Sequence, residues 1–264
     1  MFRFARRPGS ALVALCVLTF AVPALAQTTP AAPPAQKPAG DLPSAQSLID
    51  RHIQATGGAD ALKSRKSSHA VGTVTVPSQG MTGTVEIFAM RPNKMLVKQE
   101  IKGIGSGAEG FDGTTAWASS PMTGPMLVTG PELEQKKLDY DFDAMLNPRA
   151  RYSAMKTLEK TTFDGRDVYK VSLTRKEGGE DIDFYDANTG LKAGSITTRK
   201  GPMGEMTVTS TTTDYKKFGG VLVPTTIKQA ITGIEIVMTF TTFEFDTVDA
   251  SVFALPAEIK ALIK

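Results

Sequence analysis

The stretch GTVEIFAMRPNKMLVKQEI, residues 83–101, consists of two alternating runs separated by Arg91-Pro92. The first run places apolar and polar side chains on opposite faces, with Val85, Ile87 and Ala89 against Thr84 and Glu86. The second run repeats the pattern, with Met95, Val97 and Ile101 against Lys94, Lys98 and Glu100. Because successive side chains of a strand point to opposite faces, each run predicts a strand with one buried and one solvated face, which is typical of antiparallel sheets.

Similar runs rich in β-branched residues occur on both sides of this stretch, and short turn motifs separate many of them. The runs are HAVGTVTVP (69–77), DVYKVSLTRK (167–176), EDIDFYDA (180–187), LKAGSITTR (191–199), EMTVTSTTTDYKKF (205–218), VLVPTTIKQAI (221–231) and IEIVMTFTTFEF (234–245). The turn motifs are Asp112-Gly113, Asp164-Gly165, Gly178-Gly179, Asn188-Thr189-Gly190 and Gly219-Gly220. This spacing predicts a sandwich or barrel of meandering hairpins. The glycine-rich GIGSGAEG, residues 103–110, is interpreted as a flexible hairpin turn.

Three short segments have helical character. In SAQSLIDRHIQATGG, residues 44–58, an apolar stripe follows Ser44, which can cap the helix, and Gly57-Gly58 would end it. ADALKS, residues 59–64, follows as a second short turn. PELEQKKLDYDFDAML, residues 131–146, begins with Pro and Glu in favoured first-turn positions and predicts a helical insertion between two halves of the sheet. The fold class is therefore mainly β with a few helices.

The N-terminal residues have the layout of a cleaved secretory signal. Residues 1–26 combine a basic start, an apolar run from Ala11 to Val22 and an Ala-Leu-Ala motif before Gln27. The apolar run is shorter than the ~20 residues that span a bilayer. We therefore expect a signal peptide at 1–26, a Pro/Ala-rich tether at 27–43 and one domain at 44–264. The mature chain is expected in the periplasm, with no transmembrane segment.

Charge and cysteine content narrow the classes of partner. The sequence has 30 Lys and Arg against 27 Asp and Glu, and the predicted signal peptide contains Arg3, Arg6 and Arg7 but no acid, so the mature chain is balanced. A balanced chain without a clustered basic face predicts no nucleic-acid partner. Cys16, the one cysteine, lies in the signal peptide, so disulfides would not contribute to the mature fold.

The sequence lacks the residue groups that catalysis or metal binding requires. Nucleophilic catalysis needs a base beside the nucleophile, and the two histidines, His52 and His69, are interpreted as surface or packing residues. The spacing of His, Cys and carboxylates matches neither a zinc site nor a calcium loop. The acids of GGEDID, residues 178–183, are interpreted as a solvated hairpin rim. We therefore predict no catalytic residue, no bound metal and no cofactor.

The methionines leave three alternatives open. Met122 and Met126 lie in PMTGPM, and Met203 and Met206 lie in PMGEM. Methionine fills gaps in cores, lines adaptable apolar pockets and also ligates Cu(I). Copper is the least favoured alternative, because neither pair has His or Cys beside it.

Several motifs resemble those of the LolA/LolB-like superfamily of periplasmic lipoprotein carriers. These are the quoted stretch with Arg91, Pro92, Asn93 and Met95, the following GFDGTTAW (110–117) with Asp112, Gly113 and Trp117, and two later segments, FYDANTGLKAGSI (184–196) and DYKKFGGVLVPTTI (214–227). The resemblance implies a strongly curved, incompletely closed antiparallel β-barrel with helices covering its open side. Lipoprotein-transferring members have an arginine on the first strand that latches the lid, whereas HAVGTVTVP has none. Arg91 is interpreted as a structural strand-end residue.

The resemblance also implies a function and, together with the alternation, a set of lining residues. Its concave apolar face would hold a lipid, the acyl chains of a lipoprotein or another hydrophobic ligand, without catalysis. The predicted lining residues are Val85, Ile87, Met95, Val97, Trp117, Ile236, Met238 and Phe240, with Met122 and Met126 near the entrance. The alternative is an envelope module of the same fold that binds a protein partner through a sheet edge or loop.

Overall fold

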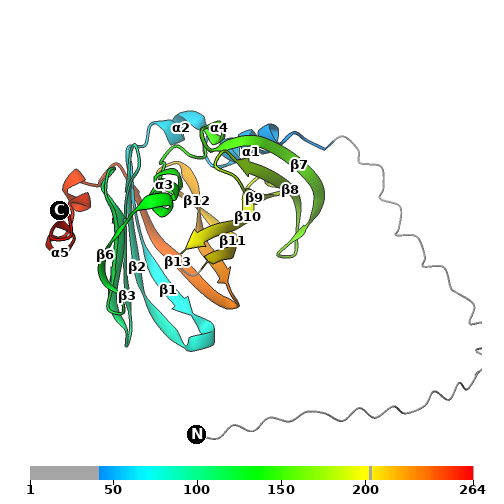
Figure 1. Ribbon diagram of the computed structural model, residues 1–264. Coiled ribbons are helices and arrows are strands. Elements are labelled where there is room, and N and C mark those ends of the chain that lie inside the picture. Colours follow the sequence, from blue (N-terminus) through cyan, green and yellow to red (C-terminus); the bar gives the residue numbers. More distant parts are fainter. Residues whose placement is uncertain (1–41, 202–203, 264) are drawn as a thin grey trace, which may run out of the picture. The chain divides into compact units, whose positions relative to one another are not determined.

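The computed structural model describes residues 42–201 and 204–263. The predicted signal peptide, residues 27–41 of the predicted tether and Met203 lie outside the described residues. The described chain forms one antiparallel sheet accompanied by a few short helices (Figure 1). The strands are β1 (Ser67–Val76), β2 (Met81–Met90), β3 (Lys94–Ile101), β4 (Gly105–Phe111), β5 (Ala116–Ser120), β6 (Gly124–Val128), β7 (Tyr152–Phe163), β8 (Arg166–Arg175), β9 (Glu180–Asp186), β10 (Lys192–Gly201), β11 (Gly204–Phe218), β12 (Val221–Ile231) and β13 (Ile234–Phe245). The helices are α1 (Ala45–Ala55), α2 (Ala59–Lys63), α3 (Gly130–Asp139), α4 (Pro148–Arg151) and α5 (Ala257–Lys260), with 3-10 turns η1 (Pro77–Gln79) and η2 (Ala250–Phe253).

The strand order is a meander whose first and last strands meet in the middle. It runs β6-β5-β4-β3-β2-β1-β13-β12-β11-β10-β9-β8-β7, so the pairing of β1 with β13 joins the two halves. Among the described strands, β6 and β7 form the two edges, and the sheet does not close on itself. The prediction of a mainly β fold built from antiparallel hairpins is confirmed. The alternatives of a two-sheet sandwich and a closed barrel are wrong.

The cross-strand register divides this sheet into two faces. Directly paired residues point the same way, and one such row crosses six strands: Val171, Asp183, Ser195, Ser210, Gln229 and Ile236. Met238 shares the face of Ile236 and pairs with Val74 of β1, which pairs with Gly83 of β2. We call this side the helix face, because α1 and α3 pack on it, and the other side the C-terminal face.

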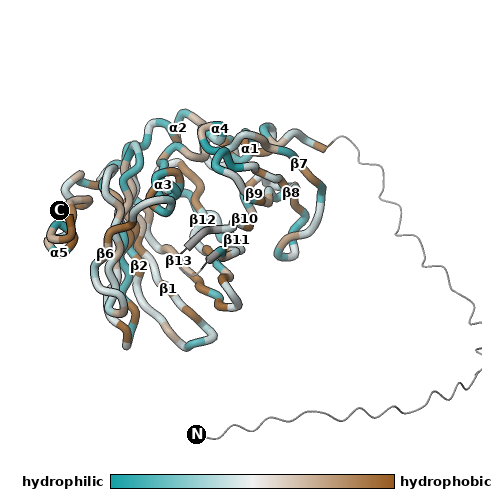
Figure 2. The backbone as a smooth tube through the Cα atoms, viewed as in Figure 1, coloured by the Kyte–Doolittle hydropathy of each residue, from teal (hydrophilic) through white to brown (hydrophobic). Residues whose placement is uncertain are grey.

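Three apolar clusters show what covers each face. On the helix face, Leu48, Ile49 and Ile53 of α1 pack against β8 and β9, and Leu133 of α3 packs near Phe111. On the C-terminal face, Phe253 and Ile259 of the last segment pack against Leu96 and Trp117. Apolar and polar residues are interspersed along the strands (Figure 2), as the alternation predicts for a sheet with two different faces.

Local hydrogen bonds help to set the beginning of α1 and the end of α3. Ser44 caps α1 by accepting from the Ser47 amide at 3.1 Å, and the helix ends before Gly57, as predicted. The predicted helix at 131–146 is wrong beyond Asp139, where α3 ends. The Asp141 carboxylate accepts from the Asp143 amide at 2.9 Å, and this local bond favours a turn over a further helical turn.

The glycine-rich segment 103–110 is also different from its prediction. Only residues 102–104 form a turn, and β4 begins at Gly105. Small residues are needed in this strand because the Trp117 ring lies over Gly110, where a Cβ atom would be 2.8 Å from the ring. A composition that is typical of turns therefore belongs here to a strand packed beneath an aromatic side chain.

Candidate binding site on the helix face

The central part of the helix face is apolar and is built from strand residues alone. Its buried core consists of Ala70, Val74, Val85 and Phe240, surrounded by the half-buried Ile87, Val97, Ile101, Ile227, Ile236, Met238 and Phe243. We call this set the central apolar patch. The clusters beneath α1 and α3, in contrast, contain helix residues. Apolar surface therefore continues across the sheet between the two helices.

The structure brings most of the predicted lining residues onto this one face. Val85, Ile87, Val97, Ile236, Met238 and Phe240 belong to the central apolar patch. Met95 lies on the same face, paired with Ala89 and Phe111. Met126 of β6 also lies on this face by its pairing with Ala118, and it is 41% exposed. Their role in binding remains a prediction.

Two predicted lining residues are placed elsewhere. Trp117 is buried on the C-terminal face, where it packs beneath Phe253 and Ile259. Met122 lies in the turn between β5 and β6 and is 86% exposed. The alternation of β5 could not orient Trp117, because its AWASS sequence has apolar residues at both parities.

A cavity of about 290 Å³ lies on the helix face beneath the segment that follows α3. Met95 of β3, Val221 and Val223 of β12 and Phe245 of β13 line its sheet side, and Phe142 and Met145 line the other. The Lys136 ammonium donates to Glu109 of β4 at 2.7 Å and to the Tyr140 hydroxyl at 2.9 Å. Burial and the nearby Glu109 carboxylate raise the pKa of Tyr140 to about 12. These bonds anchor α3 to the sheet.

Arg91 fastens the segment that covers this cavity. Its guanidinium forms an ion pair with Asp143 and lies 5.0 Å from the centre of the Phe142 ring. It also donates to the carbonyls of Leu62 and Lys63 at 3.2 Å each. Arg91 thus ties the end of β2 both to α2 and to residues 141–146. Sequence reasoning placed Arg91 at a strand end but missed this contact, because Asp143 is far from Arg91 in the sequence.

The helix face becomes polar toward β9. Asp183, Ser195, Ser210 and Gln229 occupy one continuous row from β9 to β12, which we call the polar row. With Tyr152, Lys192 and Thr197, among others, they line a cavity of about 410 Å³. Gln229 pairs directly with Ile236 of the central apolar patch. The apolar and polar parts of the helix face are therefore contiguous.

Two of the three acids of segment 178–183 are buried, which corrects the prediction of a solvated rim for them, whereas Glu180 is exposed as predicted. Asp181 is 1% exposed and Asp183 is 8% exposed. Asp181 accepts from Arg175 at 2.9 Å, and Asp183 accepts from the Lys192 ammonium at 2.6 Å and the Tyr185 hydroxyl at 3.1 Å. Burial and the Asp183 carboxylate raise the pKa of Tyr185 well above its usual value. The rule that buried charges are paired is satisfied, and the cationic partners Arg175 and Lys192 lie on the neighbouring strands β8 and β10.

The two histidines occupy structural positions. His52 of α1 is 7% exposed, and its Nδ1 accepts from the Lys192 amide at 3.2 Å. Burial, with the nearby Lys192 charge, lowers the pKa of His52 to about 4. His69 lies on the C-terminal face, stacked on Phe88 with ring centroids 4.3 Å apart and 2.9 Å from Glu86.

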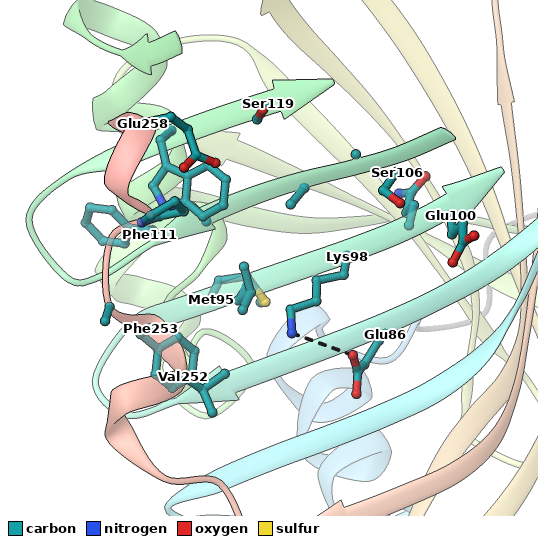
Figure 3. A pocket seen from close by; sticks show the side chains of 18 of the residues that line it. Glu86, Met95, Lys98, Glu100, Ser106, Phe111, Ser119, Val252, Phe253 and Glu258 are labelled. Carbon is teal, nitrogen blue, oxygen red and sulfur yellow. Dashed lines mark ion pairs between the residues drawn. The ribbon is translucent and has the colours of Figure 1, made fainter. Parts of the chain in front are cut away.

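A further cavity, of about 550 Å³, opens on the C-terminal face (Figure 3). Leu96, Ala108, Gly110 and Trp117 contribute to its sheet side, and residues 252–258 border one end. Lys98 points toward Glu86, with 3.9 Å between Nζ and the carboxylate. The largest of the three cavities thus lies on the face opposite the central apolar patch.

The described part of the chain, residues 42–201 and 204–263, contains no group of three His, Cys, Asp or Glu residues arranged to hold a metal ion. None of its helices is long and apolar enough to cross a membrane. Of the methionine pairs for which copper was the least favoured alternative, Met126 and Met206 lie on strands, and Met203 lies outside the described residues.

Comparison with known proteins places the fold. No protein-family model and no curated protein matches the sequence. A DUF1329 family protein from Desulfovibrio piger has a similar structure, with a TM-score of 0.55 and 13% identity, over 80% of this chain and 97% of that one. A LolA superfamily protein from Nitrosomonas europaea matches with a TM-score of 0.53 and 14% identity, over 81% of this chain and 99% of that one. The predicted resemblance is thereby confirmed for the fold, which this chain shares with these LolA superfamily and DUF1329 family structures.

Proposed function

We propose that this protein is a periplasmic carrier that holds a lipid, the acyl chains of a lipoprotein or another amphiphile against the central apolar patch. The observation that carries the proposal is that this patch consists of strand residues, many of them half-buried, whereas helices pack on the clusters at either side. A ligand chain would cover this patch in the way that helices cover the clusters at either side. The proposal includes a strongly curved half-barrel sheet with the helices across its open side.

The proposed binding needs no catalytic group. Burying an alkyl chain supplies ~0.8 kcal/mol per methylene, so a dodecyl chain could contribute roughly 10 kcal/mol before the cost of association is subtracted. The proposed entrance lies beside α3 and residues 140–146, which Arg91 holds against the sheet. We further propose that residues 1–26 direct secretion and that residues 27–43 act as a tether.

A pair of adjacent residues on β13 tests the face that binds. Met238 lies in the central apolar patch, and Thr239 points to the C-terminal face. Met238→Asp should weaken binding of a fluorescent fatty acid at least about tenfold, because a carboxylate would be placed against the ligand chain. Thr239→Asp, with the same charge on the other face, should bind like the wild type. Equal binding by both variants would rule out the central apolar patch as the site.

Native ligands can be identified by extracting the purified mature protein with organic solvent and analysing the extract by mass spectrometry. A stoichiometric lipid or acyl species supports the carrier function. The second candidate is an envelope module that binds a protein, for which β7, an edge strand among the described strands, offers backbone groups. An extract without lipid, together with a stable complex recovered from the periplasm, would favour that alternative.

A further inference from the structure

The polar end of the helix face has the chemistry of a headgroup site. We infer that the polar row, together with Tyr152, Lys192 and Thr197, binds an uncharged headgroup rich in hydroxyl or amide groups, such as a sugar. The alkyl chain of the same molecule would lie on the central apolar patch. This inference rests on the proposed function and specifies the class of amphiphile.

The two parts of the site lie within reach of one molecule. Gln229 of β12 is paired with Ile236 of β13, and Ile227, two residues before Gln229, belongs to the central apolar patch. The polar row then continues from Gln229 to Ser210, Ser195 and Asp183 on successive strands. An amphiphile lying across the strands would therefore pass from apolar to polar surface without leaving the helix face.

The polar row has unused hydrogen-bonding capacity. In the part of the chain that the structure describes, the side chains of Ser195, Thr197, Ser210 and Gln229 have no hydrogen-bond partner. Each of these groups can both donate and accept. A headgroup with several hydroxyls can satisfy them, because a hydroxyl also donates and accepts. A headgroup that only accepts, such as a polyether, would leave the acceptors of the site unmatched.

The charges around this cavity are already compensated. Among the described side chains, each cation near this cavity lies within 3.0 Å of a carboxylate oxygen, in the pairs Lys192–Asp183, Arg175–Asp181 and Arg151–Asp139. An anionic headgroup would have to compete with these carboxylates, and a cationic one with the three basic side chains. The cavity of about 410 Å³ is within the usual range of roughly 300–1,000 Å³ for small-molecule sites. Charge and size thus favour a neutral group of several polar atoms.

The test holds the alkyl chain constant and changes the headgroup. The mature protein would be titrated calorimetrically, below the critical micelle concentrations, with dodecyl maltoside, dodecyl octaethylene glycol ether and dodecyl sulfate. We expect the maltoside to bind about tenfold more tightly than either of the others, because its head supplies many hydroxyl donors as well as acceptors, whereas the ether has a single terminal hydroxyl and the sulfate has no donor. Ser210→Ala/Gln229→Leu should abolish this preference while retaining binding of the ether. Ser210→Ala alone, a milder change, should reduce the preference.

Thr209→Val is the matched control, because Thr209 is on β11 beside Ser210 but points to the C-terminal face. It should keep the wild-type preference. If all three amphiphiles bind equally, or if the sulfate binds best, the headgroup inference is overturned while the carrier function stands. If the preference survives Ser210→Ala/Gln229→Leu in a folded protein, the polar row is not the headgroup site. If none of the dodecyl compounds binds, the proposed function and the inference fail together.

Discussion

Gly110 illustrates how one residue without a side chain positions a tryptophan. A Cβ atom there would lie 2.8 Å from the Trp117 ring, which is buried against the C-terminal segment. Gly110→Ala should therefore lower the free energy of unfolding by about 1–3 kcal/mol, the usual range for overpacking. At Gly107 of the same strand the closest atom would be 3.4 Å away, so Gly107→Ala should change stability little. Equal losses in urea unfolding of the two variants would contradict this account.

His52 should make the stability of the protein depend on pH. Burial holds its imidazole neutral and lowers its pKa from 6.5 to about 4, so the unfolded chain binds more protons between these values. The contribution of His52 to the free energy of unfolding is therefore fully present above about pH 6.5 and decreases as the pH falls toward 4. The decrease caused by this residue is at most about 3 kcal/mol. His52→Gln, which retains an acceptor for the Lys192 amide, should flatten that part of the profile. The measurement is urea unfolding at several pH values, and an unchanged slope in the variant would show that other groups cause it.

At the scale of the element, the segment after α3 is held by the Arg91 side chain and by a backbone hydrogen bond from the Phe142 amide to the Pro92 carbonyl at 3.0 Å. Arg91→Ala would remove the ion pair to Asp143 and the contact with Phe142, while leaving the anchor between Lys136 and Glu109 intact. We expect amide hydrogen exchange to rise about tenfold in residues 141–146 and little in α1. Arg91→Lys keeps the charge but loses the planar contact, so its effect should be intermediate. Exchange that rises equally in α1 would indicate general destabilisation instead of release of this segment.

The elements also show why the sequence predicts some features and not others. Alternation assigned Val85, Ile87 and Val97 to one face correctly, because it depends only on local geometry. It failed where the decisive partner is remote in the sequence. Asp181 accepts from the Tyr152 hydroxyl of β7, which is not adjacent to β9, and the position of Arg91 requires a turn that is many residues away. A single sequence therefore does not show which distant segments pair with each other.

At the scale of the whole molecule, the pairing of β1 with β13 joins the two halves of the sheet, and we expect the halves to unfold as one cooperative unit. The register shifts at Gly72, where a Cβ atom would overlap the Thr239 carbonyl oxygen. Gly72→Ala should thus lower stability by at least about 2 kcal/mol. Thr73→Val, on the exposed C-terminal face of the same strand, should have little effect.

The probe that distinguishes cooperative from independent halves is the fluorescence of Trp117, the one tryptophan of the chain. Trp117 reports on the half that contains β5, whereas far-ultraviolet circular dichroism reports on all the strands. If the central pairing couples the halves, both signals should give the same urea midpoint, and Gly72→Ala should move them together. If the tryptophan midpoint stays in place while the dichroism signal splits into two transitions, the half containing β7–β13 unfolds alone. In that case the central apolar patch would be lost before the rest of the sheet, because Ile227 and Met238 both lie in that half.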